Sequence, residues 1–111
     1  MIGDEDDVAI AAVTAAELLV GVETADERHR APRLRFVEEV LSALAIEDYD
    51  LEVARVHAGL LAHGLRAGTH RGAHDLLIAA TAAARGREVV TADPRSFLNL
   101  PGVRVREAGQ N

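Results

Sequence analysis

The chain has 111 residues and a formal net charge of −6, so it is sized for one domain, residues 1–111, and is too acidic to coat nucleic acid by bulk charge. It contains no cysteine, which excludes disulfides, zinc–thiolate sites and thiol catalysis. No apolar run approaches the roughly 18 residues of a membrane span, and the acidic N-terminus is unlike a signal peptide. We therefore expect a cytoplasmic protein without a membrane segment.

The first half of the chain predicts a strand, two helices and a second strand. Val8–Val13 is apolar throughout, as in a strand buried on both faces. Thr14 and Glu17 then have the spacing of a capping box at the start of a helix. The charged segment Asp26–Arg35 contains Pro32 and predicts a helix end, a turn and the next helix start. The second helix has apolar residues at helical spacing, Leu34, Val37, Leu41 and Leu44. Ala45–Asp48 then predicts a weak strand.

The second half predicts two further helices and two further strands. Asp50 is placed to cap one helix, and Asp75 opens the other. A β-type run follows at Glu88–Thr91, then a single turn at Pro94–Leu98 and a last strand at Val103–Val105. Strands separated by helices indicate an α/β fold with right-handed crossovers. The third helix, which follows Asp50, carries an apolar stripe that we expect to face the core: Leu51, Ala54, Ala58, Leu61 and Leu65.

Three carboxylates, Glu17, Asp75 and Asp93, follow junctions that lead into helices or turns. Each has a structural explanation, because acids are favoured in caps, first helical turns and turns before proline. In an α/β sheet, however, strand C-termini and helix N-termini meet on one rim, where the three could converge. Oxygen ligands of this kind suit Mg²⁺ or Mn²⁺, which activates water for phosphodiester cleavage.

Three blocks of the sequence resemble PIN-domain ribonucleases, and especially the VapC-type toxins of bacterial toxin–antitoxin pairs. They are TAAELLVGVETA at 14–25, HDLLIAATAAARG at 74–86 and VVTADPRSF at 89–97. The resemblance implies a PIN-like α/β/α sandwich with a short, mainly parallel sheet and a Mg²⁺-dependent (or Mn²⁺-dependent) endoribonuclease site. It also implies an RNA substrate, a VapB-like antitoxin partner and a homodimer.

The same resemblance assigns the site residues. Glu17, Asp75 and Asp93 match the metal-binding, catalytic acids of the family pattern, and Thr91 matches a hydroxyl beside the metal. At Ser96, many relatives instead carry a further acid, a difference that could weaken a second metal position.

The family pattern also begins with an apolar strand ending in a motif like D-T-S, whose aspartate is the first metal ligand. Nothing in this sequence matches that motif, and the acids of residues 4–7 have no strand before them to direct their side chains. We therefore expect a VapC-like domain that lacks the first strand and helix and whose nuclease activity is impaired. Loss of a central strand would leave two unpaired inner sheet edges.

Basic residues near Asp75 are further candidates. Arg66, Arg71 and His74 could contact RNA, although solvated arginines and an exposed histidine would explain them equally well. A different class of function also fits the sequence: a catalytically inactive PIN-like module that pairs with an antitoxin or with itself.

Overall fold

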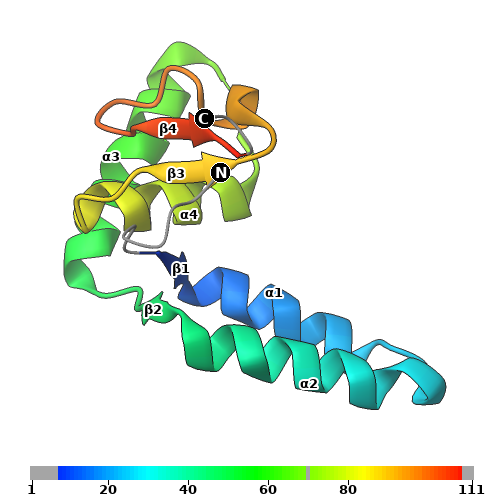
Figure 1. Ribbon diagram of the computed structural model, residues 1–111. Helices are drawn as coiled ribbons and strands as arrows, with labels where there is room; N and C mark the ends of the chain where they lie inside the picture. Colours follow the sequence, from blue (N-terminus) through cyan, green and yellow to red (C-terminus); the bar gives the residue numbers. More distant parts are fainter. Residues whose placement is uncertain (1–7, 70, 109–111) are drawn as a thin grey trace. The chain divides into compact units, whose positions relative to one another are not determined.

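The computed structural model describes residues 8–69 and 71–108, so the acids of residues 4–7 lie outside the described part (Figure 1). These residues form two compact units, 8–48 and 49–108. In chain order the elements are β1 (Ala9–Ala11), α1 (Ala12–Glu23), α2 (Glu27–Ala43), β2 (Ala45–Glu47), α3 (Leu51–Ala67), α4 (Ala73–Ala84), β3 (Val89–Thr91), the 3-10 turn η1 (Pro94–Phe97) and β4 (Val105–Glu107).

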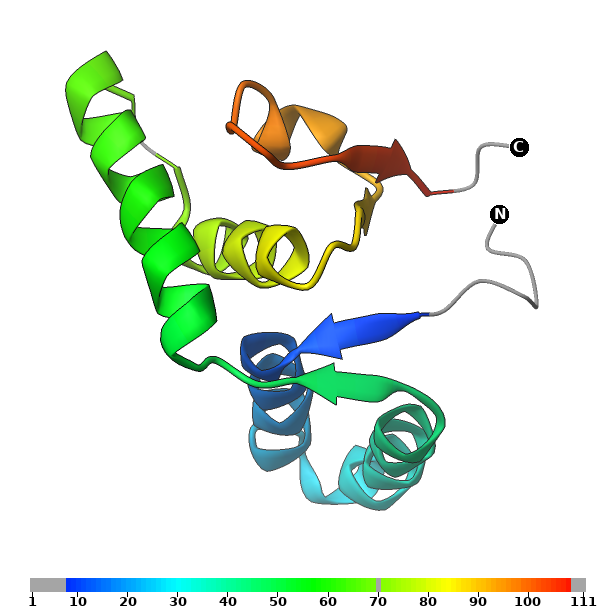
Figure 2. The ribbon, with the colours of Figure 1, turned by 90° about the vertical axis from the view of Figure 1, so that its left-hand side faces the viewer.

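The N-terminal unit combines a two-stranded parallel sheet with a helical hairpin. β1 pairs with β2 in a register that places Ala9 opposite Ala45, and α1 packs against α2 (Figure 2). Few side chains are buried here, and the buried set is small in volume: Ala11, Ala15, Val22 and Val37. The unit therefore has a thin aliphatic core.

The start of α1 differs from the sequence prediction. The strand covers only Ala9–Ala11, and the helix begins at Ala12 with Ala11 as its N-cap and no side-chain capping bond. Thr14 therefore lies inside the helix, and the predicted capping box of Thr14 and Glu17 is wrong. Alanine, the strongest helix former, extends the helix toward the N-terminus beyond the position at which threonine could cap it.

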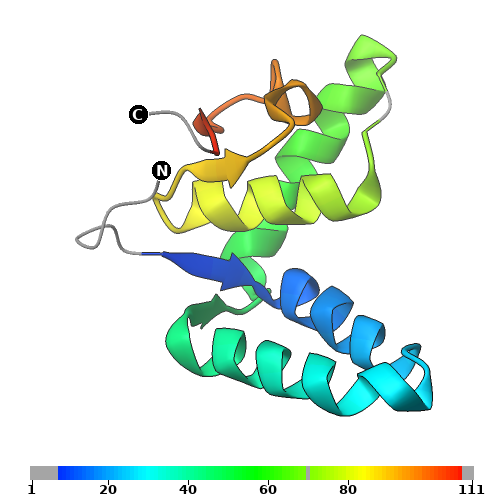
Figure 3. The same cartoon turned by 45° about the vertical axis from the view of Figure 1, so that its right-hand side comes forward.

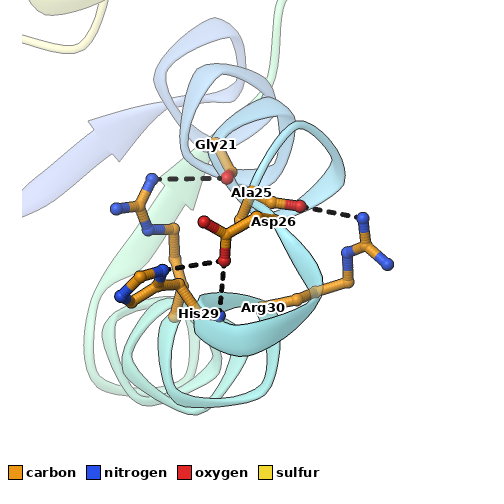
Figure 4. A network of polar contacts seen from close by, with 6 residues as sticks. Gly21, Ala25, Asp26, His29 and Arg30 are labelled. Atoms are coloured by element: carbon orange, nitrogen blue, oxygen red, sulfur yellow. Dashed lines mark hydrogen bonds and ion pairs between the residues drawn. The ribbon is translucent and has the colours of Figure 1, made fainter.

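A polar network joins the end of α1 to the start of α2 (Figure 4). Asp26 is the N-cap of α2, and its Oδ1 accepts a hydrogen bond from the backbone N–H of His29 at 3.0 Å and lies 2.7 Å from the His29 ring. Arg30 donates from Nη2 to the carbonyl of Ala25 at 2.8 Å. This part of the predicted helix–turn–helix is confirmed, but Pro32 lies inside α2 rather than in the turn.

The C-terminal unit is built on α3 and α4, which pack against each other, with a second two-stranded parallel sheet beside them (Figure 3). β3 pairs with β4, and Val89 lies opposite Val105. α3 begins after the predicted cap Asp50 and ends at Ala67, and its C-cap Gly68 has a φ of 70°, which favours glycine. The buried residues form one cluster: Val53, Leu60, Leu76, Ala79, Ala80, Val89, Phe97 and Leu100.

Two predictions for this unit are wrong in detail. The expected buried stripe of α3 faces solvent, since Leu51 and Leu65 are exposed, and the helix instead buries Val53 and Leu60. The last strand begins at Val105 rather than Val103, because the N–H of Val103 donates to the carbonyl of Leu100 and closes a turn there.

In the described residues, no helix has the length and apolar character needed to cross a membrane.

Candidate metal and RNA site

Asp75 lies in the first turn of α4, so the predicted position of this acid at the start of a helix is confirmed. The helix begins at Ala73 with Gly72 as its N-cap, and no side chain caps it. The carboxylate lies over Gly72, since a Cβ added to that glycine would be 3.4 Å from Oδ2 of Asp75. Within residues 8–69 and 71–108, no hydrogen bond or ion pair engages this carboxylate. A capping role therefore does not account for Asp75.

Asp93 follows β3 and is the N-cap of η1. Its backbone N–H donates to Oγ1 of Thr91 at 3.0 Å, so Thr91 shapes the turn that carries it. The hydroxyl of Ser96 donates to Oδ2 of Asp93 at 2.9 Å, which fixes one carboxylate oxygen. Asp93 is exposed, so its other oxygen remains accessible to a ligand.

The elements that carry Asp75 and Asp93 belong to the same unit and meet on one side of it. The C-terminal end of β3 and the N-terminal end of α4 lie on the same side of the unit in Figures 1 and 3. α4 also contacts both β3 and η1. This is the rim that the sequence predicts for strand and helix ends.

Glu17 lies on α1, in the N-terminal unit, and is exposed. The described residues contain no cluster of three or more histidine, aspartate or glutamate side chains placed to hold a metal ion. The convergence of Glu17 with Asp75 and Asp93 therefore stays a prediction.

The predicted RNA-binding residues have different surroundings. Arg66 is exposed in the last turn of α3, and His74 is exposed at the start of α4. Arg71 is half-buried, and its guanidinium donates to backbone carbonyls of the η1 segment. The sequence interpretation missed both this contact and the bond between Ser96 and Asp93. An acid three residues before a hydroxyl residue is a local signal that could have predicted the bond between Asp93 and Ser96.

The electrostatics of the unit centre on Arg85 at the end of α4. It contacts Asp50 at 2.8 Å and Glu52 at 2.7 Å, both at the N-terminal end of α3. The backbone N–H of Val53 and the guanidinium of Arg85 hold the pKa of Asp50 below its ordinary value. These bonds join the two helices that make up the core of the unit.

The profile of the PIN domain matches residues 1–103. The chain belongs to the PIN-domain family. Curated relatives place this PIN domain with the VapC type. The tRNA(fMet)-specific endonuclease VapC of Salmonella typhimurium is 39% identical over 101 residues, covering 88% of this chain and 73% of that protein. Ribonuclease VapC of Rickettsia bellii is 32% identical over 101 residues, covering 90% and 75%.

Solved structures agree with the fold of this PIN domain. VapBC2 from Rickettsia felis, bound to a promoter DNA fragment, superposes with a TM-score of 0.85 at 25% identity and covers 93% of this chain and 76% of that chain. DNA-bound VapBC from Salmonella typhimurium gives a TM-score of 0.83 at 34% identity, covering 89% and 74%. The predicted family and the PIN-like α/β/α fold are confirmed.

Proposed function

We propose that this VapC-type PIN domain is a toxin that cleaves RNA phosphodiester bonds with the help of a divalent metal ion. The observation that carries the proposal is the pair of carboxylates on one side of the C-terminal unit. Asp75 has no hydrogen-bond partner in the described chain, and Asp93 has one oxygen fixed by Ser96. The names of the curated relatives, an endonuclease and a ribonuclease, support the same chemistry.

The donor set fits a hard cation. We propose that Glu17, Asp75 and Asp93 hold Mg²⁺ or Mn²⁺, because carboxylate oxygens are the preferred ligands of both ions. When bound, the ion would supply a water of lowered pKa and neutralise charge at phosphorus. Ser96 keeps one oxygen of Asp93 in place through its hydrogen bond, so that the carboxylate is oriented before RNA arrives. Thr91 ends β3 and accepts the backbone N–H of Asp93, while Arg66 and His74 are exposed groups that can contact RNA.

The test replaces Asp75 by asparagine, which keeps the size of the side chain but removes its negative charge. We expect Asp75→Asn to lose at least tenfold in Mg²⁺-dependent cleavage of structured RNA. We expect little change in its thermal unfolding, because the carboxylate makes no hydrogen bond in the described chain. The matched control is Glu39→Gln, an exposed carboxylate of α2. Equal cleavage by the wild type and Asp75→Asn would discard the metal-binding role.

A partner protein is the second part of the proposal. The solved relatives are complexes named VapBC, which supports a VapB-like antitoxin for this chain, and homodimerisation is proposed beside it. The hairpin of α1 and α2 exposes large apolar side chains, notably Val20 at 56% and Phe36 at 61%, that a partner could cover. The same surface would also serve the alternative, a catalytically inactive binding module that pairs with an antitoxin or with itself. That alternative predicts a stable antitoxin complex and no metal-dependent cleavage by the folded wild-type chain.

A further inference from the structure

Arg71 joins two segments that are far apart in the sequence. It lies in the loop between α3 and α4, just before the N-cap Gly72. Its Nη1 donates to the carbonyls of Arg95 at 3.3 Å and Ser96 at 3.2 Å, and its Nη2 donates to the carbonyl of Leu98. One guanidinium thus binds three backbone carbonyls, two within η1 and one just after it.

The η1 segment suits this contact. Phe97, the last residue of η1, and Leu100, three residues later, are buried in the core, so the backbone between them is held in place. The last carbonyls of a short helical turn have few backbone donors, so a side-chain donor can bind them. A guanidinium is planar and carries five N–H donors, so it can bind several carbonyls at once, whereas an ammonium acts as a single point charge.

Both ends of this contact lead to a proposed metal ligand. On one side, Arg71 precedes Gly72, whose backbone lies beneath the Asp75 carboxylate. On the other, Ser96 offers its carbonyl to Arg71 and its hydroxyl to Oδ2 of Asp93. We propose that Arg71 is a positioning residue that sets the separation of Asp75 and Asp93. This inference rests on the proposed function, since it assumes that the two carboxylates share a metal ion.

The competing role for Arg71 is a direct contact with an RNA phosphate. Its Nη1 and Nη2 are already engaged with three carbonyls, which leaves only part of its five N–H donors for a phosphate. Arg66 provides the contrast, because it is exposed in the last turn of α3. The two arginines should therefore affect different measurements.

The experiment compares Arg71→Gln, Arg71→Lys and the control Arg66→Gln in two binding assays. Mn²⁺ binding without RNA is followed by electron paramagnetic resonance, and RNA binding is measured without metal at low salt. We expect Arg71→Gln to weaken Mn²⁺ binding by about 10–100-fold, the usual effect of removing a residue that orients metal ligands, and to leave metal-free RNA binding unchanged. Arg71→Lys should lie between it and the wild type. Arg66→Gln should keep Mn²⁺ binding and weaken RNA binding.

Unchanged Mn²⁺ affinity in both Arg71 variants would overturn the positioning role, as would a loss confined to RNA binding. Circular dichroism checks that each variant is folded. If Arg71→Gln does not fold, Arg71→Lys is used in its place for the comparison with Arg66→Gln. If the wild type binds no Mn²⁺, the metal-binding proposal itself fails. The positioning role is then decided by the carboxyl carbon chemical shift of Asp93, which should move in Arg71→Gln but not in Arg66→Gln. An unmoved shift would end the proposal.

Discussion

Asp50 has two roles at the start of α3. Its Oδ1 accepts the backbone N–H of Val53 at 3.1 Å, which caps the helix, and its Oδ2 lies 2.8 Å from Nη2 of Arg85. Both contacts favour the ionised carboxylate, so the pKa of Asp50 in the folded chain is lower than the ordinary value of an aspartate. A group of this kind stabilises the fold above its unfolded pKa.

This predicts a pH-dependent difference between the wild type and Asp50→Asn. Asparagine caps a helix as well as aspartate does but lacks the charge that attracts Arg85. The wild type should therefore be more stable at pH 7, and the difference should shrink as the pH falls below about 4 and through the lowered pKa of Asp50. Urea unfolding midpoints at pH 7, 5 and 3 measure this. A difference that stays constant down to pH 3, as expected for the control Glu39→Gln, would refute the assignment.

At the candidate site, local sequence signals located the acids but not the residues that hold them. Asp75 and Asp93 stand where a helix begins and a strand has just ended, and both boundaries are visible in the sequence. Arg71 bonds to carbonyls 24, 25 and 27 residues away, so its partners depend on how η1 folds back onto the unit. Glu17 illustrates a further limit, because its convergence with the other two acids requires long-range structure that no local pattern encodes.

At the scale of the element, α3 shows why periodicity alone chose the wrong face. The helix carries two apolar stripes, one through Val53 and Leu60 and one through Leu51, Leu61 and Leu65. Only the first is buried, against α4 and the residues around it. Hydrophobic period identifies a helix, but it cannot decide between two apolar faces when either could pack.

The two faces predict opposite costs for the same substitution. Leu60 is 3% exposed and Leu65 is 83% exposed. Leu60→Ala should therefore lose about 2–5 kcal/mol of unfolding free energy, through lost burial and the cavity left behind. Leu65→Ala should change it by less than about 0.5 kcal/mol. Chemical denaturation compares the two, with Leu60→Met as a milder variant if Leu60→Ala does not fold. Similar losses at both positions would contradict the assigned faces.

At the scale of the whole molecule, the order of helices and strands was predictable, and so was the family, from three blocks spread over the chain. The pairing of the strands was harder to predict from the sequence. Each strand is only three residues long, and the described strands form two separate parallel pairs, β1 with β2 and β3 with β4. Such short runs carry few residues from which to read a register, and parallel pairing joins segments distant in sequence.

The two units differ in what they bury, which predicts unequal local stability. The N-terminal unit buries two alanines and two valines, whereas the C-terminal cluster also includes three leucines and a phenylalanine. Local opening costs less free energy where less apolar surface is buried. Backbone amides in the middle of α1 and α2 should therefore exchange with solvent at least tenfold faster, after correction for intrinsic rates, than those in α3 and α4. This ratio corresponds to about 1.4 kcal/mol.

Hydrogen exchange measured by NMR tests the difference residue by residue. Leu60→Ala provides the matched perturbation, because it weakens the C-terminal core and should bring the protection of α3 and α4 closer to that of α1 and α2. Equal protection in both units of the wild type would show that their amides exchange through one global unfolding event. In that case the small core of Ala11, Ala15, Val22 and Val37 would be as stable as the larger one, and burial would not govern local opening here.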